Sequence, residues 1–154
     1  MRITRAVLAA CILACAGAAR AQQAGDLGAG VVVGRPIGAT AKYWLDGTKA
    51  LDLGVGFSDD PVAYGDFLWH GWDLFPQPAR GKLGGYVGLG PRIQAAPDTQ
   101  FALRTIAGVD YWVDKQPIEL FVEAGPVFRM TPTGDVDADV GLGVRFYFGA
   151  KSAK

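Results

Sequence analysis

Apolar and polar residues alternate along most of the chain after residue 25. In residues 50–57, every second position from Leu51 to Phe57 holds a large apolar side chain, and the positions between them hold Asp or Gly. A period of two residues is typical of β-strands with two unlike faces. Glycine inside these stretches disfavours helices, because each interior glycine costs about 1 kcal/mol relative to alanine. The pattern predicts eight strands, over residues 26–34, 38–45, 50–57, 62–70, 82–92, 100–113, 118–129 and 138–148.

These strands follow one another too closely for crossover helices, so we expect them to pair as an antiparallel meander. Asp46-Gly47 predicts a tight turn, and a proline-rich connection spans residues 71–81. Eight strands can close into a barrel, and closure removes the unpaired edges that invite aggregation. The expected fold class is therefore all-β, an eight-stranded antiparallel up-and-down β-barrel.

One face of the predicted strands carries glycines and charged residues of both signs. Water could solvate such a face, but frequent glycine is an unusual choice for a surface. Glycine suits a narrow lumen that must admit large charged neighbours, and an eight-stranded barrel is just wide enough for side chains to fill. We therefore expect a lumenal polar network of Lys42, Asp52, Asp66, His70, Arg92, Arg104, Asp110, Glu119, Glu123 and Arg145.

Aromatic residues on the apolar face gather near the strand ends. With the first strand starting in the periplasm, one set lies near the periplasmic ends of the even-numbered strands and the other at the opposite rim. Two aromatic girdles around an aliphatic band are typical of outer-membrane barrels. The predicted girdles contain Tyr43, Trp69, Tyr111, Phe146 and Phe148 at one end, and Phe57, Phe101 and Phe128 at the other.

The N-terminal segment has the pattern of a secretory signal peptide. Arg2 and Arg5 precede an apolar run over residues 6–17, and Ala19-Arg20-Ala21 is a cleavage motif. We expect a signal peptide over 1–21, a β-barrel domain over 22–148 and a C-terminal tail over 149–154. An alternative is a lipoprotein box that ends at Cys15, with this residue acylated and retained.

Charge and composition exclude several functions. The chain has 15 basic and 15 acidic residues, and the segment 1–21 holds three of the basic ones, so the mature chain carries 12 against 15. The sequence has no basic patch of the kind that binds nucleic acid. After the N-terminal segment, no stretch of the chain reaches the ~18 consecutive apolar residues of a membrane helix. A membrane location therefore requires a closed barrel.

Candidate catalytic and metal sites are sparse. His70 is the only histidine, and Ser58 is expected in a loop at the opposite rim, so we expect no enzyme activity. Asp135, Asp137 and Asp139 alternate and could attract Ca²⁺, but a solvated acidic strand end is the favoured interpretation. We expect no metal and no cofactor.

The chain resembles a small outer-membrane β-barrel family first described in spirochaetes. The resemblance rests on GAGVVVGRPIGATAKYWL, DFLWH, GGYVGLGPR, PIELFVEAGPV and GVRFYF, in that order. It implies an OmpA-like transmembrane barrel. Some spirochaetal members bind host complement regulators, but no loop residue here matches a binding motif. The final GVRFYF resembles the terminal strand signal of outer-membrane proteins, which implies recognition by the barrel-assembly machinery.

The sequence thus predicts an integral outer-membrane protein of a Gram-negative bacterium, with a structural or surface-interaction role and no open pore. Its expected partner is outer-membrane lipid, and we expect a monomer. One alternative is a soluble periplasmic barrel that binds a small apolar ligand, with Trp69, Tyr111 and Phe146 in its cavity. Another is a lipid-modifying barrel enzyme that uses His70.

Overall fold

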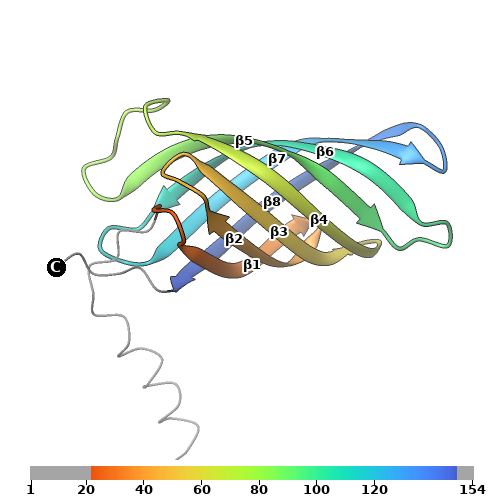
Figure 1. Ribbon diagram of the computed structural model, residues 1–154, viewed down its shortest axis with the longest axis horizontal. Coiled ribbons are helices and arrows are strands. Elements are labelled where there is room, and N and C mark those ends of the chain that lie inside the picture. The colour runs from red at the N-terminus through yellow and green to blue at the C-terminus, as the bar shows by residue number, and fades with distance from the viewer. Residues whose placement is uncertain (1–21, 149–154) are drawn as a thin grey trace, which may run out of the picture.

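The computed structural model describes residues 22–148, which form one closed antiparallel barrel of eight strands (Figure 1). The fold class predicted from the sequence is confirmed. The proposed signal peptide and the tail over 149–154 lie outside the described residues. Within residues 22–148, no helix has the length and hydropathy needed to cross a membrane. The strands are β1 Leu27–Arg35, β2 Ile37–Trp44, β3 Lys49–Ser58, β4 Asp60–Gly71, β5 Lys82–Gln94, β6 Gln100–Trp112, β7 Ile118–Thr131 and β8 Asp135–Phe148.

The strands are strongly inclined to the barrel axis. Following the strand register once around the barrel from Leu27 leads to Ala138 on β8. The register between β8 and β1, continued past the end of β1, places Ala138 opposite a point ten residues beyond Leu27, at the level that would be number 37 if β1 continued. The offset from 27 to 37 is ten residues. With standard strand spacings, this offset corresponds to a tilt of about 40° and a rise of about 2.5 Å per residue along the axis.

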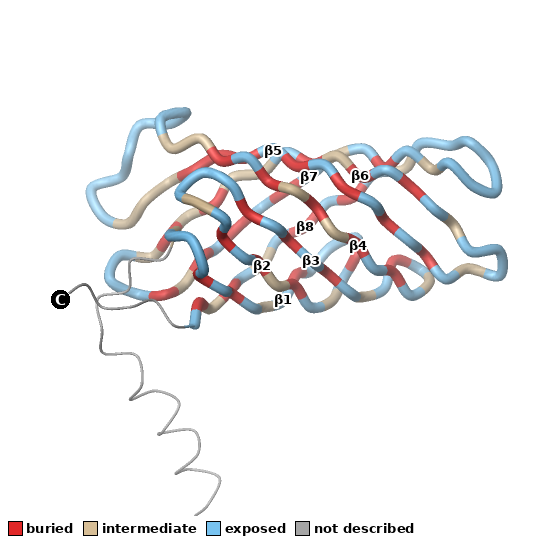
Figure 2. The backbone as a smooth tube through the Cα atoms, viewed as in Figure 1, coloured by how far each residue is buried: buried red, intermediate tan, exposed pale blue. Residues whose placement is uncertain are grey.

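Burial alternates along every strand, as Figure 2 shows by its red and pale blue segments. Side chains that point outward are mainly apolar and exposed, for example Leu53 at 61% and Leu142 at 63%. Side chains that point inward include charged groups with almost no exposed surface, such as Lys42 and Arg145. The sequence alternation therefore reflects an apolar outer wall around a polar and aromatic interior.

The connections at the two ends of the barrel differ in length. At the end that carries the described termini, here called the terminal end, they comprise residues 45–48, 72–81 and 113–117. At the opposite, or far, end, Pro36 alone joins β1 to β2 and Asp59 alone joins β3 to β4. The longer loop predicted over 58–61 is wrong, because Ser58 belongs to β3 and Asp60 and Pro61 belong to β4. Asp59 makes this tight connection in the left-handed conformation, with φ of 67°.

The predicted turn at Asp46 is present at the terminal end. The Asp46 carboxylate accepts hydrogen bonds from the backbone N–H groups of Thr48 at 2.7 Å and Lys49 at 2.8 Å, and from the Thr48 hydroxyl. These hydrogen bonds, chiefly those from Thr48, hold the pKa of the Asp46 carboxyl well below its usual range.

The far end is uneven, because the β7–β8 hairpin extends beyond the β1–β2 hairpin. β1 ends opposite Val140, so within residues 22–148 no strand pairs with the Asp135–Asp139 part of β8 on that side. Two backbone N–H groups in this part of β8 donate to acidic side chains instead. Val136 donates to Oδ1 of Asp135 at 2.8 Å, and Ala138 donates to Oδ1 of Asp137 at 2.9 Å.

Candidate functional site

The barrel interior is the candidate site, and the structure places all ten predicted network residues there. None of them is more than 7% exposed. They come from seven of the eight strands and face one another because each occupies an inward position of its strand. The buried set comprises Lys42 on β2, Asp52 on β3, Asp66 and His70 on β4, Arg92 on β5, Arg104 and Asp110 on β6, Glu119 and Glu123 on β7, and Arg145 on β8.

One ionic cluster is centred on Arg104. Its guanidinium binds Asp66, reaches Oε1 of Glu123 at 2.7 Å and donates from Nε to Oδ2 of Asp139 at 2.8 Å. The ring of Tyr64 lies against the same guanidinium, 4.2 Å from Cζ to the ring centroid. Asp139 was missing from the predicted network, because its sequence context suggested a solvated strand end.

A second cluster is centred on Arg145, nearer the terminal end. Its guanidinium binds Asp52 at 2.8 Å, donates to the Thr40 hydroxyl and approaches Glu119 at 3.4 Å. Lys42 binds the other oxygen of Glu119 at 2.7 Å. Each charge in this cluster therefore has a partner of opposite sign, which buried charges require.

The acids outnumber the bases among the buried residues of the strands. Six acids, namely the five in the predicted network and Asp139, face the four bases Lys42, Arg92, Arg104 and Arg145. Oδ1 of Asp66 and Oδ1 of Asp110 are buried and have no hydrogen-bond partner. The compensation of charge that the sequence suggested is therefore close but incomplete.

His70 lies in the interior near the terminal end. Its Nε2 is 2.9 Å from Nζ of Lys42. Because a lysine ammonium only donates, Nε2 accepts this hydrogen bond and the ring proton is on Nδ1. Ser58 lies at the far end, where its hydroxyl accepts a hydrogen bond from Nε of Arg35 at 3.0 Å. The two residues lie at opposite ends of the antiparallel β3–β4 pair, about 20 Å apart along the axis.

Aromatic rings close the interior at the terminal end. Trp44 is fully buried and packs against Trp112 and Trp72, with ring centroids 6.1 and 6.0 Å away. Trp112 packs in turn on Tyr147 at 4.6 Å, and the Tyr147 hydroxyl donates to Glu119 at 2.6 Å. This cluster was not predicted from the sequence, although its strand residues occupy inward positions by the same alternation as the charged residues.

Glycines make room for these rings. A Cβ atom at Gly54 would overlap the ring of Tyr64, and one at Gly108 would overlap the ring of Tyr86. The sequence pattern predicts that lumenal glycines admit charged neighbours. At these positions they admit aromatic rings that then contact the charged groups, as Tyr86 does by donating to Glu123 at 2.7 Å.

The acidic triplet at the start of β8 does not form one site. Asp135 and Asp137 stay at the far rim beside Arg129, whereas Asp139 points inward to Arg104. Within residues 22–148, no group of three or more His, Cys, Asp or Glu side chains has an arrangement that could hold a metal ion.

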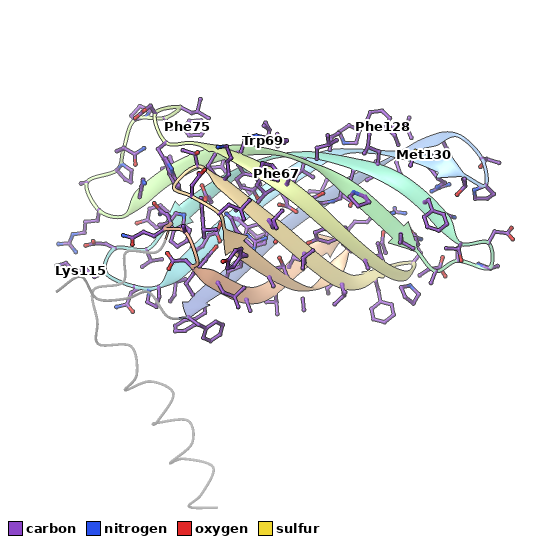
Figure 3. The ribbon with its side chains drawn as sticks, viewed as in Figure 1. Phe67, Trp69, Phe75, Lys115, Phe128 and Met130 are labelled. Atoms are coloured by element: carbon purple, nitrogen blue, oxygen red, sulfur yellow. The ribbon has the colours of Figure 1, made fainter. Side chains whose placement is uncertain are left out.

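The predicted girdle residues all occupy outward positions of their strands. Phe57 at 61%, Phe148 at 55% and Phe101 at 48% are among the most exposed. Figure 3 shows Trp69 toward the terminal end and Phe128 toward the far end. The register and tilt separate the two sets of aromatic residues by about 22 Å along the axis.

Comparison with solved structures gives a match in fold. The crystal structure of the N-terminal β-barrel domain of Pseudomonas aeruginosa OprF superposes with a TM-score of 0.60 at 19% identity, and the match covers 82% of this chain and 98% of that one. The OmpA-like fold implied by the sequence resemblance is therefore confirmed. No protein-family profile and no curated protein matches the chain, so the narrower spirochaetal family has no support from these comparisons.

Proposed function

We propose that this chain is an integral outer-membrane β-barrel of a Gram-negative bacterium, with a structural or surface-interaction role in the cell envelope. Its lumen is filled by side chains and is not an open pore. The chain reaches the membrane through a cleaved signal peptide, and outer-membrane lipid surrounds it.

One observation carries the proposal: the polarity of the barrel is inverted relative to that of a water-soluble protein. Leu53, Val122 and Leu142 on the outer wall are 50–63% exposed, whereas Glu119 and Arg145 inside have no exposed surface. In water, each square ångström of this apolar wall would cost about 25 cal/mol relative to burial. In lipid the same wall is solvated, and closure of the barrel pairs each strand with a neighbour on both sides across the apolar wall.

The spacing of the aromatic residues supports the same proposal. Outer-membrane barrels present an apolar band about 25 Å tall between two aromatic girdles. The aromatic residues here are about 22 Å apart by the register. The outer wall therefore has the height that such a membrane requires.

The filled interior argues against transport. Arg104 and Arg145 bridge acids from different strands across the lumen, and Trp44, Trp72 and Trp112 occupy the terminal end. Water or solutes could cross only by displacing these groups.

The two alternatives have less support. In a soluble ligand-binding barrel, Trp69, Tyr111 and Phe146 would line a cavity, but all three lie on the outer wall. A Ser–His enzyme would need His70 beside Ser58, and these lie at opposite ends of the barrel.

The test is gel mobility of the unheated protein. Full-length protein expressed in a Gram-negative host is extracted in detergent from the outer-membrane fraction, and unheated and boiled samples are compared. We expect the unheated protein to remain folded in detergent and to shift on boiling. Recovery of the protein in the soluble periplasm, without detergent and without a shift, would refute the membrane location and favour the soluble barrel.

A further inference from the structure

The β4–β5 connection, residues 72–81, straddles the rim at the terminal end. Its first residue, Trp72, turns toward the lumen. Nε1 of Trp72 donates to the Gly47 carbonyl at 2.7 Å, and the ring stacks on Trp44 at an interplanar angle of 25°. The Lys82 ammonium lies 3.6 Å from the centroid of the Trp72 ring. These contacts fix the start of the connection over the mouth of the barrel.

The next apolar residues, Leu74 and Phe75, lie on the outside instead. They cover Gly71 and Gly85, two cross-strand neighbours at outward positions of β4 and β5. A Cβ atom at Gly85 would lie 2.9 Å from Cδ1 of Leu74 and 3.0 Å from Cε2 of Phe75. Gly85 is consequently buried although it lies on the outer wall, whereas Leu74 remains 65% exposed and Phe75 38% exposed.

Gln77 holds the connection in this position. Its side-chain amide donates to the Leu83 carbonyl at 2.8 Å and accepts from the Leu83 N–H at 3.0 Å. The same amide donates to the Trp72 carbonyl at 2.8 Å. β4 stops pairing with β5 at Gly85, so the Gln77 side chain takes the place of a strand partner beyond that point.

Phe75 lies at the level of the terminal-end aromatic residues. Outward positions at this end hold Tyr43 on β2, Trp69 on β4 and Tyr111 on β6, whereas β5 offers only Leu83 and Gly85 there. The outer wall thus has no aromatic side chain on β5 at this level. The connection folds back so that Leu74 and Phe75 cover Gly85. In Figure 3, Phe75 and Trp69 lie along the same outer side of the barrel toward this end.

On the basis of the proposed membrane location, we propose that residues 72–81 are a membrane-interface anchor. The anchor places Leu74 and Phe75 among the lipid chains just below the headgroups, in the leaflet on the side of the described termini. Phospholipid is the partner, because the exposed parts of both side chains continue the apolar wall formed by Trp69 and Val87. Amphipathic segments that lie on membranes bury their apolar side chains to a similar shallow depth.

Quenching of a fluorophore by lipids measures this depth directly. In the full chain carrying Cys11→Ser and Cys15→Ser, single cysteines are introduced as Phe75→Cys, Ala79→Cys or Leu53→Cys and labelled with a small environment-sensitive dye. The protein is reconstituted in phosphatidylethanolamine–phosphatidylglycerol vesicles that contain lipids with a nitroxide either near the headgroup or near the chain terminus. Ala79 is the matched control, because it belongs to the same connection and is exposed.

We expect the shallow nitroxide to quench the dye at position 75 about threefold more strongly than the dye at position 79. The deep nitroxide should quench the dye at position 53 most strongly. Adding Gln77→Ala to Phe75→Cys should lower the quenching at 75 to the level at 79, because the clamp on Leu83 is lost.

The outcomes separate the two proposals. If the dye at position 53 is quenched and the dye at position 75 is no more quenched than the dye at 79, the anchor is refuted. This result would mean that water or a second copy of the chain, and not lipid, contacts the connection. Unchanged quenching at 75 in the Gln77→Ala variant would refute the positioning role of Gln77. If position 53 is not quenched, the membrane location itself fails.

Discussion

A charge placed on the outer wall should destabilise the barrel according to its depth. Leu53 and Met130 form a matched pair, because both are outward-facing and 61% exposed. Leu53 lies four residues from Phe57 on β3, which places it about 10 Å from the far-end aromatic residues and close to the middle of the wall. Met130 lies about 18 Å farther along the axis, beyond Phe128.

The proposed membrane location makes the expected effects differ, because an arginine at the middle of the wall would have to lose water or distort the bilayer. Leu53→Arg should lower the free energy of unfolding by about 2–4 kcal/mol, and Met130→Arg should lower it by about 0–1 kcal/mol. On a water-exposed surface, both substitutions would change stability by only about 0.5 kcal/mol.

Equilibrium unfolding in urea, in phospholipid vesicles, measures this difference, with tryptophan fluorescence as the signal. Gel mobility of unheated samples gives an independent measure of the folded fraction. Equal effects of the two substitutions, or a larger effect at Met130, would show that lipid does not contact the centre of the wall.

Two further pairs of substitutions test the interior. Arg104→Met leaves several buried acids without their base and should cost about 3–5 kcal/mol, and adding Glu123→Gln should recover part of this loss; a purely additive double variant in the same unfolding assay would contradict the ionic cluster. Gly54→Ala should cost about 1–3 kcal/mol, because the new methyl group overlaps the ring of Tyr64. Gly134→Ala, where the methyl group would meet no atom within 4 Å, is the control, and equal stability of the two alanine variants would argue against a tightly filled lumen.

The strands were predictable because the two faces of each strand have different surroundings. This constraint acts on every second residue. The predicted bounds of β5 and β6 agree with the structure to within two residues, and the inward position of every predicted network residue followed from the same alternation. The connection between β3 and β4 was predicted less well. Asp60 and Pro61 resemble loop residues, but proline is tolerated near a strand end, where a missing donor is least costly.

The partners within the lumen could not be predicted. Alternation tells which face a residue occupies, but the pairing of Arg104 with Asp139 depends on how far the register advances around the closed barrel. Asp139 therefore looked like one of three solvated acids. The contact of Leu74 and Phe75 with the outer wall was also not predicted, because turn residues such as proline gave no indication that this connection folds back on the barrel.

The Asp135–Asp139 part of β8 is a strand edge that β1 does not cover. Such an edge can pair with a strand of another molecule, and the side chains here oppose that pairing. An extended peptide that docked there would need the N–H groups of Val136 and Ala138, which Asp135 and Asp137 already occupy. It would also have to approach two carboxylates at close range. We therefore expect this part of β8 not to extend its sheet by pairing with a strand of another molecule, because Asp135 and Asp137 occupy the N–H groups that such pairing needs.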